Sequence, residues 1–100
     1  MKVIAMCGSL KFEPEFRHHS ERLELEGNCV LSVIYPTAED KDAYTPEQHE
    51  QLDLAHKKKI DMADAIFVVN KNGYIGSSTR DEIEYAKALG KEILFLEEGI

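Results

Sequence analysis

The sequence predicts a single α/β domain of 100 residues, in which helices cover both faces of a parallel sheet of about four strands. Two observations lead to this prediction. Four short apolar runs are separated by longer polar segments that have the composition of helices. The runs are continuously apolar rather than alternating, which is typical of strands that are covered on both faces. Strands that alternate with helices form right-handed βαβ units and hence a parallel sheet.

The first half of the predicted pattern contains two strands and one helix. The four predicted strands of the whole chain cover residues 3–6, 30–34, 65–69 and 93–96. The first helix is expected over residues 13–26, and Gly27 suits its end. One stripe of this helix carries the side chains that would face the sheet, which are Phe12, Phe16, His19 and Leu23.

The second helix has the clearest start signal of the chain. Thr45 can cap the helix, Pro46 suits its first position, and Gln48 completes a capping box. This helix is expected to continue to Met62, and a third helix is expected over about residues 78–90. With three crossover helices, the commonest strand order is the doubly wound 2-1-3-4, as in flavodoxin-like and Rossmann-like sheets.

Composition and charge limit the classes of partner. The formal net charge is −7, from 19 acidic and 12 basic residues, which argues against binding a nucleic-acid polymer but allows a small anionic ligand. Cys7 and Cys29 lie in apolar runs and are expected to be buried and reduced. No cysteine or histidine spacing indicates a metal site, so neither a metal nor another cofactor is expected. Without a signal-like or membrane-spanning run, the expected location is the cytoplasm, with no membrane partner.

The strand order predicts where a ligand binds. In the order 2-1-3-4 the chain reverses direction between the first and third strands, and the loops after them open a crevice at the carboxyl edge of the sheet. Residues 7–12 and 70–79 are therefore expected to form its two sides, with glycines that allow close approach and hydroxyls that can bind a phosphate or sugar oxygen. The candidate binding residues are Gly8, Ser9, Leu10, Lys11, Asn70, Gly76, Ser77 and Ser78.

Two side chains are candidates for chemistry, and each has a plainer interpretation. Glu82 fits a capping box that begins at Thr79, but a carboxylate in the first turn of a helix beside the crevice can also act as a nucleophile or base. His56 lies in a polar, lysine-rich helical run and could be an ordinary surface residue. Because histidine titrates near neutrality, it could instead donate a proton if its helix flanks the crevice.

Three segments resemble the nucleoside 2-deoxyribosyltransferase superfamily. The segment 63–69 (ADAIFVV) resembles the third strand of that superfamily, and the segment 82–86 (EIEYA) resembles its nucleophile helix, with Glu84 in place of a glycine. The segment 6–11 (MCGSLK) is similar to the phosphate loop of the 2'-deoxynucleoside 5'-phosphate N-hydrolase branch. The resemblance covers nearly the whole chain with its segments in the correct order.

The resemblance implies roles for three positions. In the superfamily the helix glutamate attacks the anomeric carbon of the sugar and forms a glycosyl-enzyme, and the matching residue is Glu82. Where the superfamily usually has an aspartate, this chain has His56, which becomes the candidate proton donor. Gly76 replaces a sugar-binding aspartate or serine, so one of the two following serines would have to substitute. The resemblance also implies a homodimer, because related active sites are completed across a subunit interface.

Two functions from different classes follow from these residues. The first is an enzyme that cleaves or exchanges the N-glycosidic bond of a nucleoside or its 5'-monophosphate. Hydrolysis is preferred over deoxyribosyl transfer because the Gly8-Ser9 pair suits a 5'-phosphate. The second is a nucleotide-binding module that has lost catalysis and senses or sequesters its ligand. The replacements at His56 and Gly76 favour the module, whereas Glu82 favours the enzyme.

Overall fold

The structure, a computed structural model, describes residues 1–37 and 43–98. Its elements in chain order are β1 (Val3–Gly8), η1 (Leu10–Phe12), α1 (Glu13–Leu25), β2 (Cys29–Leu31), α2 (Pro46–Met62), β3 (Ala65–Val69), η3 (Lys71–Gly73), α3 (Ser77–Ala88) and β4 (Glu92–Phe95). The strands pair in parallel in the order β2-β1-β3-β4. The predicted fold class and strand order are therefore confirmed.

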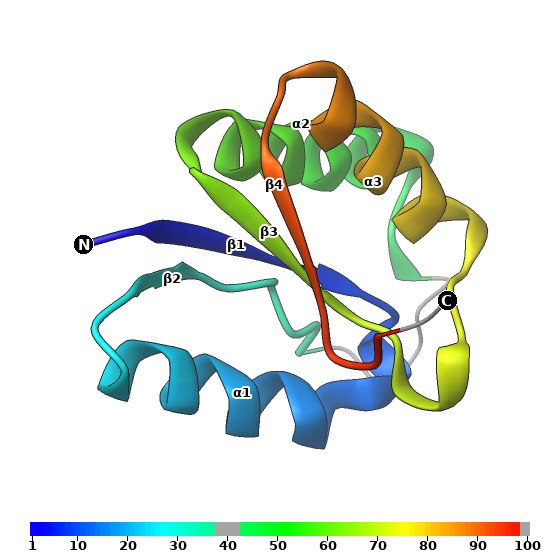
Figure 1. The fold of residues 1–100 in the computed structure, drawn as a ribbon. Helices are drawn as coiled ribbons and strands as arrows, with labels where there is room; N and C mark the ends of the chain where they lie inside the picture. The colour runs from blue at the N-terminus through cyan, green and yellow to red at the C-terminus, as the bar shows by residue number, and fades with distance from the viewer. Residues whose placement is uncertain (38–42, 99–100) are drawn as a thin grey trace.

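The sheet is the middle layer of three. Helix α1 covers one face, and α2 and α3 lie side by side on the other (Figure 1). Each face has its own apolar cluster, because successive side chains of a strand point to opposite sides. Ile4 and Met6 of β1 pack with Phe16 toward α1, whereas Ala5 and Cys7 pack toward α2 and α3. The thiol of Cys7 therefore lies on the face that carries the two later helices.

The helix signals were largely correct. Helix α2 runs from Pro46 to Met62 and begins with the predicted capping box between Thr45 and Gln48. Helix α1 ends one residue earlier than predicted, and Gly27 after it has a φ of 100°. None of the helices in the described ranges is long and apolar enough to cross a bilayer.

Two boundaries differ from the prediction in ways that shape the site. The second strand was expected to extend to Ile34, but β2 ends at Leu31, and Lys59 of α2 donates a hydrogen bond to the Ser32 carbonyl at 2.8 Å. The chain after β2 thus leaves the sheet beside the last residues of β1. Helix α3 begins at Ser77, one residue before the predicted range, and its N-cap is Gly76.

Candidate active site

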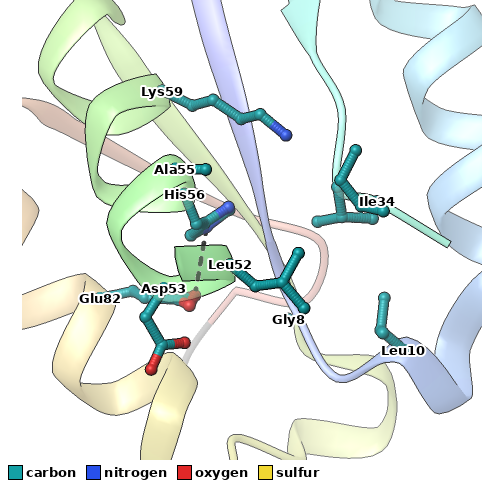
Figure 2. A pocket seen from close by; sticks show the side chains of 10 residues that line it. Gly8, Leu10, Ile34, Leu52, Asp53, Ala55, His56, Lys59 and Glu82 are labelled. Atoms are coloured by element: carbon teal, nitrogen blue, oxygen red, sulfur yellow. Dashed lines mark ion pairs between the residues drawn. The ribbon is translucent and has the colours of Figure 1, made fainter. Parts of the chain in front are cut away.

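A pocket opens at the carboxyl end of β1, between the chain after β2 and helices α2 and α3 (Figure 2). Its lining comes from four parts of the chain and consists of Gly8, Leu10, Val33, Ile34, Leu52, Asp53, Ala55, His56, Lys59 and Glu82. A second pocket shares Asp53, His56 and Glu82 with the first and is also lined by Lys57, Ser78 and Asp81. The three shared residues therefore stand at the junction of the two hollows.

The start of α3 decides what the Glu82 side chain does. In a capping box with Thr79 as N-cap, Glu82 would fold back onto the Thr79 amide. The helix instead begins at Ser77 and Gly76 accepts the first helical hydrogen bond, from Arg80. The Glu82 carboxylate turns toward α2, and its Oε1 lies 3.5 Å from Nε2 of His56. The side chain of Glu82 is 23% exposed, so the carboxylate remains open to a ligand in the pocket.

His56 contacts two other side chains with a single ring nitrogen. Its Nε2 lies 3.5 Å from the Glu82 carboxylate and 3.4 Å from Sγ of Cys7. The ring is held on the inner side of α2, one helical turn before the buried Ile60. The side chain is 15% exposed, so it is not the ordinary surface residue of the plainer interpretation.

Cys7 lies in the first predicted loop, but the sequence assigned it no role in the site. Its side chain has no solvent exposure, as expected, but it lies under the site rather than only within the apolar core. Burial raises the pKa of the Cys7 thiol well above its ordinary value, and the charge of Glu82 raises it further. The thiol is therefore protonated at neutral pH. The signal that could have found it is the alternation of β1, which turns Cys7 toward the helices that carry His56 and Glu82.

Gly8 ends β1 and forms the floor of the pocket. Its φ of 144° is a conformation that side chains disfavour. A Cβ at this position would lie 2.9 Å from the carbonyl oxygen of Val69 and 3.1 Å from Cζ of Phe16. Only glycine allows the two strands to pack this closely where the backbone reaches the pocket.

The other residues of the first predicted loop connect it to the second. Leu10 lines the pocket, and Ser9 caps η1 by accepting a hydrogen bond from the Lys11 amide at 3.4 Å. The Lys11 ammonium lies 3.3 Å from the centre of the Tyr74 ring, which follows η3. The two loops predicted to form the crevice therefore meet through a cation–π contact.

The second predicted loop contributes less to the main pocket than expected. Asn70 is buried, and its side chain exchanges hydrogen bonds of 2.9 and 2.8 Å with the backbone of Glu97. Gly76 and Ser77 form the start of α3, and Ser77 is exposed. Ser78 lines the second pocket beside Glu82. Helix α2, rather than this loop, therefore forms the side of the main pocket opposite Gly8.

Two charged residues of the pocket were not singled out in the sequence. Asp53 and Lys59 lie three residues before and after His56, and side chains at this spacing share one face of a helix. Once His56 is placed in a site, that spacing predicts both neighbours. Asp53, His56 and Lys59 therefore follow one another along the side of the pocket that α2 forms (Figure 2).

A solved structure of a known protein shares the architecture of this chain. No protein-family model matches the chain, and a search of the curated proteins found no match. Among solved structures, the chain is similar to the CMP N-glycosidase BcmB of Clostridium botulinum, with a TM-score of 0.56. The two share a fold. Their sequences are 23% identical over an alignment that covers 94% of this chain and 67% of the glycosidase chain, so the likeness is one of architecture.

Proposed function

We propose that this protein cleaves the N-glycosidic bond of a nucleoside 5'-monophosphate, with Glu82 as the nucleophile and His56 as the proton donor. The observation that carries the proposal is the Glu82 carboxylate, which lies in the pocket 3.5 Å from His56 instead of capping its own helix. The similar architecture of a CMP N-glycosidase supports the class of substrate. The proposed substrate is a single small molecule bound in the pocket at the end of β1.

The proposed reaction has the two steps of a retaining glycosidase. In the first step a Glu82 oxygen bonds to C1' of the sugar while the bond from C1' to the base breaks. The electron pair of that bond goes to the base, which takes a proton from His56. In the second step the neutral His56 accepts a proton from water, the water oxygen bonds to C1', and Glu82 leaves as a carboxylate.

The free and substrate-bound geometries must differ in this scheme. The acid and the nucleophile of retaining glycosidases lie about 5–5.5 Å apart, so that a sugar fits between them. His56 and Glu82 are in contact at 3.5 Å without a substrate. We expect the His56 ring to turn away from Glu82, toward the base, when the sugar enters.

Two lysines make the pocket suitable for a 5'-phosphate. The chain has a net charge of −7, so its general field repels an anion. Lys59 nevertheless lines the pocket, and Lys11 follows the Gly8-Ser9 segment. The Lys11 ammonium lies over the Tyr74 ring and would have to leave it to reach a phosphate. A phosphate in the pocket would bind these ammonium groups and the backbone amides of that segment. For this reason hydrolysis of a nucleotide is preferred over deoxyribosyl transfer between nucleosides.

The test is to incubate the protein with a panel of ribo- and deoxynucleosides and their 5'-monophosphates, and to measure the released free base by chromatography. We expect at least one monophosphate to lose its base, and Glu82→Gln to lower kcat by about a thousandfold or more. Glu84→Gln is the matched control, because Glu84 lies on the same helix but is exposed and pairs with Lys87 at 3.7 Å. It should retain the wild-type rate, and circular dichroism should show that both variants are folded.

A non-catalytic nucleotide-binding module is the second candidate. It is favoured by Gly76, which offers no side chain at the position where the resemblance implies a sugar-binding group. If the wild type binds a nucleotide saturably and releases no base from any member of the panel, the binding module is the correct function and the enzyme is not. Release that requires a second free base as acceptor would indicate a transferase instead of a hydrolase.

A further inference from the structure

Three different metal-binding atoms meet where the two pockets adjoin. They are the thiol sulfur of Cys7, Nε2 of His56 and a carboxylate oxygen of Glu82, and all lie within 4.8 Å of one another. Thiolate, imidazole and carboxylate are the side-chain ligands of zinc in proteins. The sequence showed no such spacing because β1, α2 and α3 each supply one ligand.

The two separations that involve His56 suit one tetrahedral ion. Bonds of about 2.3 Å to sulfur and about 2.05 Å to nitrogen and oxygen place tetrahedral ligands ~3.6 Å apart for sulfur and nitrogen, and ~3.4 Å apart for nitrogen and oxygen. The observed distances are 3.4 Å between Cys7 and His56 and 3.5 Å between His56 and Glu82. The third separation, between the Cys7 sulfur and the Glu82 carboxylate, lies within 4.8 Å, and binding would bring these two atoms to about 3.6 Å.

The cluster also has a closed side and an open side. Cys7 is fully buried beneath it, whereas His56 and Glu82 line both pockets. Three protein ligands with the fourth position facing a pocket is the arrangement of zinc sites that hold water or an exchangeable ligand. A thiolate and a carboxylate together would balance the two positive charges of the ion.

We propose that Cys7, His56 and Glu82 bind a divalent metal ion such as Zn²⁺, and that the bound ion inhibits the proposed glycosidase. On binding, the thiol proton of Cys7 passes to solvent, and sulfur, nitrogen and oxygen each donate an electron pair to the ion. The ion then holds the lone pairs that the reaction needs from Glu82 and His56. The binding part stands on the geometry alone, and only the inhibition rests on the proposed function.

The binding is tested by titrating the full chain with Co²⁺ under reducing conditions and recording its absorption spectrum. We expect one Co²⁺ per chain, with a thiolate-to-cobalt charge-transfer band and the intense visible bands of a tetrahedral site. Zn²⁺ should abolish these bands by displacement. Cys7→Ser should remove the charge-transfer band, and Cys29→Ser should keep it, because Cys29 is the other free thiol and lies on β2.

A second variant protects the test against misfolding of the first. His56→Gln should weaken Co²⁺ binding by more than about a hundredfold. Loss of a residue that only supports a ligand through a hydrogen bond weakens metal binding by about a hundredfold at most, so a larger effect identifies His56 as a ligand. Circular dichroism should show that this variant is folded. Absence of the charge-transfer band in the wild type, or its loss in Cys29→Ser but not in Cys7→Ser, would overturn the site.

The inhibition is tested separately, by adding Zn²⁺ to the base-release assay. We expect the rate to fall with the same midpoint that Zn²⁺ shows in displacing Co²⁺, and a chelator to restore it. If Zn²⁺ displaces Co²⁺ but leaves the rate of base release unchanged, the inhibition is overturned and the metal site stands. If no nucleotide loses its base, the proposed function and the inhibition both fail, whereas the cobalt spectrum still decides whether the site binds metal.

Discussion

At the scale of single residues, Gly8 is the most constrained position of the site. Its φ of 144° and the 2.9 Å separation between a built Cβ and the Val69 carbonyl act together. We predict that Gly8→Ala lowers the free energy of unfolding by about 2–5 kcal/mol, from backbone strain and overpacking combined. Urea denaturation measures the change.

Gly90 provides the comparison for this prediction. It also has a positive φ, of 74°, but a Cβ there would meet no atom within 4 Å. Gly90→Ala should therefore cost only the strain of the left-handed conformation, about 1 kcal/mol. Equal costs at the two positions would show that the close packing of Gly8 against β3 contributes nothing to stability.

Also at this scale, the sequence identified the reactive candidates but not their neighbours. Glu82 and His56 were named from their residue types and from the resemblance, and the structure brings them into contact. Cys7 was interpreted as a core residue because its flanks are apolar, and burial alone does not reveal what a thiol touches. Its contact with His56 joins residues 49 positions apart, which no local spacing can predict.

At the scale of elements, strong local signals were sufficient. The capping box at Thr45 places α2 correctly because its hydrogen bonds involve only residues three apart in the chain. The third strand, Ala65–Val69, was predicted with its observed bounds, since it is apolar throughout and buried on both faces. Both elements are determined by short-range pattern and by burial in the middle of the sheet.

Two element boundaries depended on contacts that the sequence does not display. The apolar run after β2 continues to Ile34, but the chain turns out of the sheet at Ser32, whose carbonyl accepts a hydrogen bond from Lys59. The start of α3 was ambiguous because two serines and a threonine are all good caps. The N-cap is Gly76 rather than Thr79, and this difference of three residues separates a capping Glu82 from one that reaches His56.

At the scale of the whole molecule, the homodimer implied by the resemblance remains a proposal. Two large apolar side chains that line the pocket are exposed, namely Ile34 (58%) and Leu52 (37%). A partner subunit that covers this patch would shield the pocket as well, since Ile34 and Leu52 line it.

Sedimentation equilibrium tests this proposal directly. We expect a dimer for the wild type and a monomer for Leu52→Glu, because a buried charge without a partner opposes association. Leu25→Glu is the control, since Leu25 is 82% exposed at the end of α1, on the opposite face of the sheet. A monomeric wild type would contradict the dimer, and loss of the dimer in Leu25→Glu alone would move its interface to α1.

The most direct test of the central claim is to trap the glycosyl-enzyme. A 2'-fluoro analogue of the best substrate should react and then hydrolyse slowly, because fluorine beside C1' destabilises the oxocarbenium character of both transition states. We predict that mass spectrometry finds one sugar phosphate added per chain, on the peptide that carries Glu82, and none on Glu82→Gln. An adduct on any other residue, or release of base with inversion at C1', would contradict a mechanism in which Glu82 is the nucleophile.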